Sequence, residues 1–256
     1  MPALIDVVLG HDPDLEVYPA RLHGAACSWF THPDSAHSEP KEFSVGPLTG
    51  DATRSRWTLG WLARADPPPV PREVRFGEST AAVLDCRVSS VGFAQLVSAG
   101  AVASATLDIV SPMFFSRNGR DYPLPDPVLV IQSLARSWNR CADELQIGSD
   151  LLTELSRCVY LVAMDGGTAS ARVSSHVDQV GFVGTFTVGV TAAASNDCRV
   201  ALGALGRFAP VCGLGASTAR GFGACGGVAV RPFNKPTRHG PTGMRRATLP
   251  SQRVAG

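Results

Sequence analysis

Hydrophobic and polar positions alternate along several short stretches of the chain and recur with helical spacing along others. In the first part of the chain, residues 3–9 form an apolar run that ends at a glycine, and residues 18–30 carry apolar side chains at helical spacing. The alternation then returns several times before a second, shorter helical pattern. We therefore expect strands over residues 42–48, 56–62, 73–76 and 82–88, and a short helix over 91–98.

The second part of the chain repeats this order of elements. A strand over residues 104–110 is expected to end at Ser111–Pro112, and a helix over 193–208 is expected to end before Pro210, because proline cannot donate a backbone hydrogen bond. The remaining elements are helices over 127–139 and 151–157 and strands over 160–164, 171–175, 180–190 and 226–230.

Two successive β-α-β-β-α-β units predict an α+β protein built from a tandem duplicated ferredoxin-like (RRM-like) fold with a C-terminal Gly-rich loop. We expect an N-terminal domain over residues 1–103, a C-terminal domain over 104–230 and a basic, flexible tail over 231–256.

Composition narrows the class of protein. Hydrophobic residues make up 45% of the 256 residues, which is enough for a globular core. The seven cysteines form no C-x-x-C pair, which favours buried thiols in a reducing, cytoplasmic setting over disulfides or zinc. The N-terminus lacks an export signal, and the longest uncharged stretch is too polar to span a membrane, so we expect no membrane association.

Charge is distributed unevenly although the net charge is only +1. Residues 1–50 hold seven acids and two bases, whereas residues 231–256 hold six bases and no acid. A basic tail can bind phosphates, and it can equally be a solvated terminus.

The Gly-rich stretch near the C-terminus has the pattern G-x-G-x5-G-x-G. Its glycines are Gly213, Gly215, Gly221 and Gly223, and the segment between them carries Ser217, Thr218 and Arg220. Glycine permits positive φ and close backbone approach, and successive N–H groups can face an anion. The segment lacks the Gly-Lys-Ser/Thr of a P-loop, and the sequence after it predicts a strand where a dinucleotide fingerprint needs a helix. Phosphate binding and a turn without a ligand therefore both remain open.

Three blocks of the sequence resemble a known family. The blocks are FVGTFTVGV with ALGALGRFAPVCGLG and STARGFGACGGV; LDIVSPMFFSRNGRDYPLPDPVLVIQSLARSWN; and HSEPKEFSVGPL. Together they are similar to the Cas endoribonucleases that process CRISPR precursor RNA, within the RAMP superfamily. The resemblance implies two ferredoxin-like domains with RNA bound across them.

The resemblance also implies metal-independent cleavage, in which a ribose 2′-OH attacks the adjacent phosphate and gives 5′-OH and 2′,3′-cyclic phosphate ends. No cofactor or metal is expected. His37 matches the family's loop histidine, and Lys41, the single lysine before residue 235, is the candidate for charge stabilisation. His32 and His23 are further catalytic candidates.

The partner expected from the resemblance is CRISPR repeat RNA, both precursor and processed guide, and the resemblance allows other Cas effector subunits as well as a monomer or a homodimer. Arginines and the Gly-rich loop are the candidates for phosphate contacts. They are Arg54, Arg56, Arg117, Arg120, Arg207, Gly213, Gly215, Ser217, Thr218, Arg220, Gly221 and Gly223.

Two other functions compete with cleavage. A non-catalytic RAMP subunit of a CRISPR effector complex accounts for the Gly-rich loop and the duplicated fold, but gives no reason for the histidine loop. A small-molecule enzyme that binds a nucleotide phosphate lacks the acidic partner expected for the ribose.

Overall fold

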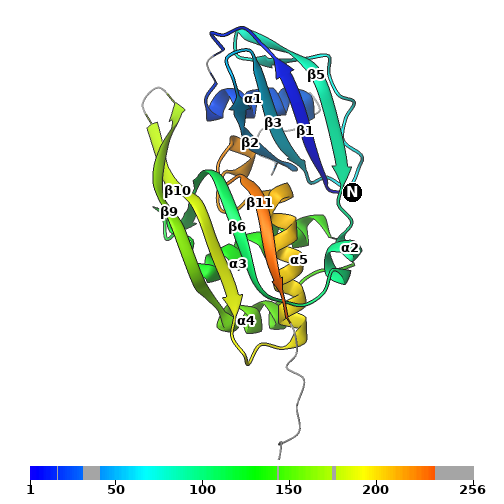
Figure 1. Cartoon of the computed structure of the whole chain (residues 1–256), viewed down its shortest axis with the longest axis vertical. Coiled ribbons are helices and arrows are strands. Elements are labelled where there is room, and N and C mark those ends of the chain that lie inside the picture. The colour runs from blue at the N-terminus through cyan, green and yellow to red at the C-terminus, as the bar shows by residue number, and fades with distance from the viewer. Residues whose placement is uncertain (16, 31–40, 143, 175–176, 234–256) are drawn as a thin grey trace, which may run out of the picture.

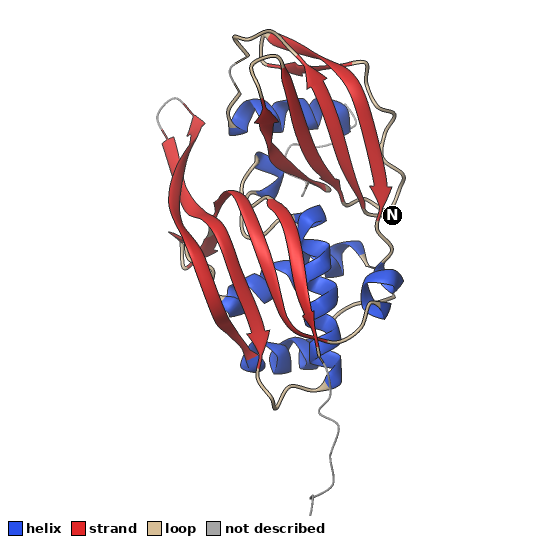
Figure 2. Ribbon diagram, viewed as in Figure 1, coloured by secondary structure: helices blue, strands red, loops and turns tan. Residues whose placement is uncertain are grey.

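The computed structural model describes residues 1–15, 17–30, 41–142, 144–174 and 177–233. Two twisted antiparallel sheets follow one another along the long axis of the molecule, each with helices on one face (Figure 1, Figure 2). The chain completes the first sheet before it enters the second.

The first sheet has five strands in the order β2-β3-β1-β5-β4. Its inner face alternates as the sequence predicts: the side chains of Ala3, Ile5, Val7 and Leu9 are fully buried, while those between them are partly exposed. The elements are β1 (Ala3–Gly10), α1 (Pro19–Phe30), β2 (Phe43–Gly50), β3 (Arg54–Trp61), β4 (Glu73–Phe76) and β5 (Ser79–Ser90).

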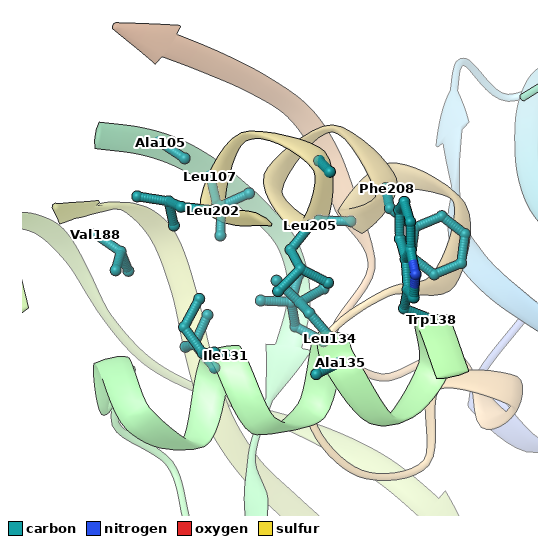
Figure 3. Packing of buried hydrophobic residues seen from close by; sticks show 14 of the residues in the cluster. Ala105, Leu107, Ile131, Leu134, Ala135, Trp138, Val188, Leu202, Leu205 and Phe208 are labelled. Atoms are coloured by element: carbon teal, nitrogen blue, oxygen red, sulfur yellow. The ribbon is translucent and has the colours of Figure 1, made fainter. Parts of the chain in front are cut away.

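The second sheet has four strands in the order β11-β6-β10-β9. Its core lies between the sheet and the helices, where Ile131 and Trp138 of α3 pack with Leu205 and Phe208 of α5 (Figure 3). The elements are α2 (Phe93–Ser98), β6 (Val102–Met113), β7 (Phe115–Arg117), β8 (Arg120–Tyr122), α3 (Pro127–Cys141), α4 (Ser149–Cys158), β9 (Val159–Ser174), β10 (Val177–Val190), α5 (Asn196–Cys212), the 3₁₀ turn η1 (Thr218–Arg220) and β11 (Cys225–Pro232).

Both halves arrange their strands in the same way. If β4 is set aside, the first sheet runs β2-β3-β1-β5 and the second runs β9-β10-β6-β11, which is the same order of second, third, first and fourth strand. The prediction of a duplicated ferredoxin-like fold is confirmed. The domain boundary at residue 103/104 stays a prediction.

Two prolines do not end their elements as expected. Strand β6 continues through Pro112 to Met113, because the pairing with β10 is interrupted between Ile109 and Met113, so the ladder needs no donor at the proline. Helix α5 continues through Pro210 to Cys212. Its last turn is held by burial of Val211 and Cys212, which offsets the lost helical hydrogen bond.

The two strands predicted over residues 160–164 and 171–175 form one long strand, β9. Gly166 lies opposite Gly184 of β10, and both have positive φ, 150° and 129°. A Cβ on Gly166 would lie 2.9 Å from the Gly184 Cα. The paired glycines let the two backbones approach and bend without breaking the ladder.

The end of α5 contacts the first sheet. The Ser44 hydroxyl donates a 2.7 Å hydrogen bond to the Val211 carbonyl, and a Cβ on Gly60 would lie only 1.7 Å from the same oxygen. Helix α2, expected to complete the first half, packs Leu96 into the second core instead. Within the described ranges, no helix has the length and apolarity needed to cross a membrane.

Candidate nucleic-acid interface

A pocket of about 540 Å³ lies where α1, the start of β2, α3 and the Gly-rich loop meet. In Figure 1 the loop and η1, coloured orange, lie between α1 and the second sheet. The pocket is therefore built from both halves of the chain. It is lined by His23, Lys41, Ser133, Arg136, Ser137, Arg140, Gly215, Ser217, Thr218, Ala219 and Arg220.

The pocket is strongly basic. Lys41, Arg136, Arg140 and Arg220 contribute four cations, and no carboxylate is among the lining residues that the structure describes. The other polar groups are hydroxyls and one imidazole. Cations together with hydroxyl donors are the groups that bind a phosphate, so the arrangement suits an anionic ligand.

His23 connects α1 to the Gly-rich loop. Its Nδ1 lies 2.8 Å from the Ala219 carbonyl oxygen, so Nδ1 carries the proton and donates it there. Its Nε2 then accepts from the Cys27 thiol, 3.5 Å away. Burial lowers the pKa of His23, and the charges of Arg220 and Lys41 lower it further, against an opposing effect of the Ala219 hydrogen bond. Both ring nitrogens thus have partners, which favours a neutral, anchoring histidine.

The Gly-rich loop is held by its own backbone. The N–H groups of Gly213, Gly215, Gly221 and Gly223 donate to the Ala209 carbonyl, the Ser133 hydroxyl, the Thr218 carbonyl and the Pro112 carbonyl. The glycine N–H groups are therefore occupied within the protein, contrary to the expectation that they face an anion.

The loop needs glycines because neighbouring backbone atoms pack closely against it. Gly223 has φ +63°, and a Cβ there would lie 1.8 Å from the Leu214 carbonyl oxygen. Gly215 has φ +85°, and a Cβ there would lie 2.2 Å from the Phe114 carbonyl oxygen. The glycines shape the loop so that the residues between them, Ser217, Thr218 and Arg220, line the pocket.

Only two of the four predicted catalytic residues are among those that the structure describes. Lys41 and His23 line the same pocket. His37 and His32 lie outside the described residues.

Five predicted arginines lie away from this pocket. Arg54 and Arg56 are on β3, and Arg56 lines a separate cleft of about 400 Å³ that also contains Asp6 and Asp108. The Arg207 guanidinium donates to the Ala99 carbonyl, 3.3 Å away, next to α2. The other two, Arg117 and Arg120, are exposed in the β7–β8 hairpin.

Sequence reasoning missed the α3 side of the pocket. Ser133, Arg136, Ser137 and Arg140 follow one another at spacings of three, one and three residues along α3, so they share one face of the helix. The opposite, buried face contains Ile131, Leu134, Ala135 and Trp138. That buried stripe was visible in the sequence, and the polar stripe beside it was the available signal.

No three His, Cys, Asp or Glu side chains in the described part of the chain come together in a way that could hold a metal ion. The seven cysteines are all free. The described lining of the pocket contains a histidine but no carboxylate or thiol.

Comparison with known proteins gives one family. Residues 107–225 match the family model described as CRISPR-associated endoribonuclease Cas6. These residues include the whole Gly-rich loop and all of α3. A search of curated proteins gives no match.

Several solved Cas6 structures share the fold. One Cas6 product complex has a TM-score of 0.71 at 24% identity and covers 90% of this chain and 99% of that one. A second Cas6 product complex has a TM-score of 0.74 at 22% identity and covers 88% and 99%. Cas6 of Thermus thermophilus has a TM-score of 0.67 at 22% identity and covers 88% and 97%. At these identities the likeness concerns the fold of nearly the whole chain.

Proposed function

We propose that the chain is a Cas6 endoribonuclease, the family whose model its residues 107–225 match, and that it cleaves CRISPR repeat RNA without a metal ion to release guide RNAs. The observation that carries this proposal is the basic pocket between the two halves, whose described lining residues include four cations and no carboxylate. Solved Cas6 relatives of the same fold are described as product and substrate-mimic complexes.

The proposed reaction is an internal transesterification. The ribose 2′-OH loses its proton and its oxygen attacks the adjacent phosphorus, while the bond from phosphorus to the 5′-oxygen breaks. The leaving 5′-oxygen takes up a proton. The products are a 2′,3′-cyclic phosphate and a 5′-OH end, and the charge that develops on the phosphoryl oxygens needs nearby cations.

Lys41 and Arg220 are the groups we propose for that charge. Both line the pocket: Lys41 lies two residues before β2, and Arg220 is the last residue of η1. His23 lines the same pocket, and the charges of both groups lower its pKa. A guanidinium and an ammonium there would stabilise the pentavalent phosphate.

His37 is the proposed proton-transfer group, with His32 as the second candidate. His37 precedes Lys41 by four residues, so its Cα is at most about 14 Å from that of Lys41. A histidine in this segment is therefore within reach of the pocket. A solved Cas6 structure is that of a histidine-to-alanine variant.

His23 has a different proposed role from the proton transfer first assigned to it. Since Nδ1 is bonded to Ala219 and Nε2 faces Cys27, neither nitrogen is free for the reacting oxygens. We assign His23 to positioning: it holds η1, and with it Arg220, against α1.

The wider RNA contacts are also proposals. Arg117 and Arg120 of the β7–β8 hairpin are exposed and available for the backbone of a longer RNA, as is Arg54 on β3. Arg56 shares its cleft with two aspartates, and Arg207 is engaged by Ala99, so we expect smaller contributions from both.

The test is cleavage of end-labelled repeat RNA in excess EDTA, with a 2′-deoxy substitution at the cut site. Cleavage in EDTA that disappears with the deoxy sugar is expected. His37→Ala should abolish cutting and keep RNA binding, whereas His11→Ala, at the far end of β1 where the ring faces Ser55, should cut normally. Wild-type protein that binds the RNA and leaves it intact would support a non-catalytic RNA-binding subunit instead.

A further inference from the structure

One face of α3 forms a wall of the pocket. Ser133, Arg136, Ser137 and Arg140, here called the α3 stripe, line it, and none of them was singled out by the sequence. The rest of α3 is fixed in place. Asp126 caps its first turn by accepting from Val128 and Leu129, and its opposite face is buried in the second core.

The α3 stripe is tied to the Gly-rich loop. The Ser133 hydroxyl accepts a 2.9 Å hydrogen bond from the Gly215 N–H, and Arg140 approaches the Ser137 hydroxyl at 3.5 Å. The two arginines therefore project from a rigid helix that is joined to the loop carrying Arg220. A pre-organised set of donors of this kind loses little freedom when an anion binds.

Within the described part of the chain, no carboxylate pairs with the charges of the α3 stripe. Among the described residues, neither Arg136 nor Arg140 forms an ion pair, and the pocket adds Lys41 and Arg220 without a carboxylate. The whole chain has a net charge of only +1, so the four cations around one pocket are a local concentration of positive charge. Like charges held together repel, and an anion between them relieves that repulsion.

We propose that Arg136 and Arg140 bind two consecutive phosphates of one RNA strand, so that α3 runs alongside the backbone next to the cut site. This proposal rests on the proposed function. Residues four apart on a helix are separated by about 6 Å along the axis. That rise is close to the spacing of neighbouring phosphates along a strand. Guanidinium groups bind each phosphate through two parallel hydrogen bonds, which fixes the register of the RNA.

The first test is binding of repeat RNA that carries a 2′-deoxy sugar at the cut site, measured over a range of salt concentrations. Arg136→Gln and Arg140→Gln should each weaken binding roughly tenfold and lower the slope of log affinity against log salt by about 0.7–0.9. The double variant should lower it by about twice as much. Arg157→Gln, an exposed arginine in the last turn of α4, is the matched control and should leave affinity and slope unchanged.

The second test pairs each arginine with one phosphate. Single neutral methylphosphonate groups are placed in turn along the repeat RNA. Wild-type protein should lose affinity at two adjacent positions. The RNA affinity of Arg136→Gln should not change when the methylphosphonate is at one of these positions, and that of Arg140→Gln should not change when it is at the other. In each case the arginine that would contact the neutralised phosphate has already been removed. Arg→Lys at either position should restore the salt slope but only part of the affinity.

The outcomes separate this proposal from the proposed function. Undiminished binding by both glutamine variants, or equal methylphosphonate sensitivity in wild type and variants, would overturn the phosphate contacts while cleavage by the wild type stands. If the wild type does not cut repeat RNA but each arginine still pairs with one phosphate, the proposed nuclease activity is refuted and the phosphate contacts stand. Circular dichroism of each variant shows that the fold is retained.

Discussion

The two halves of the molecule have the same strand order but differ in what joins the third strand to the fourth. In the second half that connection is α5 followed by the Gly-rich loop. In the first half it is an extended segment with three consecutive prolines and the short strand β4. One copy therefore has a long buried helix where the other, in its described residues, has none.

This difference between the connections helps to explain how each half contributes to the pocket. The first half contributes α1 and Lys41, and the second contributes α3 and the loop after α5. Where the first half has no second helix, its sheet receives the end of α5 through Ser44 and Gly60. The two halves have similar sheets, and the helix α5, which is present in one connection only, brings the second half into contact with the first beside the pocket.

Replacement of Gly223 should have the largest effect. Gly223→Ala places a Cβ in a backbone with φ +63° and 1.8 Å from the Leu214 carbonyl, so the loop must distort. We expect a loss of about 2–5 kcal/mol in the free energy of unfolding from strain and overlap together, and loss of RNA cleavage. Urea denaturation and the cleavage assay measure both. Gly227→Ala, where a Cβ meets nothing within 4 Å, should change neither, and equal effects of the two substitutions would refute the strain argument.

Gly60→Ala tests the contact between the halves. The added Cβ overlaps the Val211 carbonyl and the Ser44 hydroxyl at 1.7 and 2.4 Å, so the first sheet must move away from α5. A destabilisation of about 1–3 kcal/mol is expected. Thermal unfolding followed by circular dichroism measures it, with Gly167→Ala as a control in open space. A melting temperature equal to that of the wild type would show that the halves are not held at this point.

The pH dependence of stability tests His23. Its pKa in the folded protein lies below the ordinary value of about 6.5, so the unfolded chain binds more protons as pH falls through that value. Stability contributed by the neutral ring is thus fully present above about pH 6.5 and is lost as pH falls towards the lowered pKa. His23→Gln removes this titration.

The measurement is urea unfolding of wild type and His23→Gln between pH 7.5 and 5.5. The wild type should lose more stability than the variant over this range, and cleavage by the variant should fall because η1 loses its anchor at Ala219. Parallel stability profiles for the two proteins would contradict the assignment of a buried, neutral histidine.

The smallest expected effect is a gain in stability. Gly24 is exposed within α1, and a Cβ there meets no atom within 4 Å. Gly24→Ala should stabilise the first half by about 0.5–1 kcal/mol, since alanine loses less backbone entropy in a helix. Chemical denaturation checks this, and a decrease in stability would mean that α1 needs the glycine for a contact not seen here.

Periodicity predicted most of the fold, because most elements bury one regular face. The strand β1 and the helix α3 were predicted within two residues at either end. The errors fell where tertiary contacts overrode a local signal. Pro112 is tolerated because the ladder is interrupted there, Pro210 because burial continues beyond it, and Gly166 because a second glycine lies opposite.

The site was less predictable than the fold. The Gly-rich loop was found from the spacing of its glycines, whereas Lys41 was found from the family resemblance together with its being the single lysine before residue 235. The α3 stripe was not found, because an arginine on the polar face of an amphipathic helix is normally solvated. What distinguishes Arg136 and Arg140 is that elements more than 70 residues away in sequence surround the same pocket.

The hydrogen bond from Ser44 to the Val211 carbonyl has a mechanical consequence. It joins the two halves two residues before the Gly-rich loop begins, and the His23–Ala219 hydrogen bond joins α1 to the same loop a few residues later. The loop is therefore held from the first half at its start and again at η1. A substitution that loosens either bond would act on the pocket wall directly, although neither bond involves a charged group of the pocket.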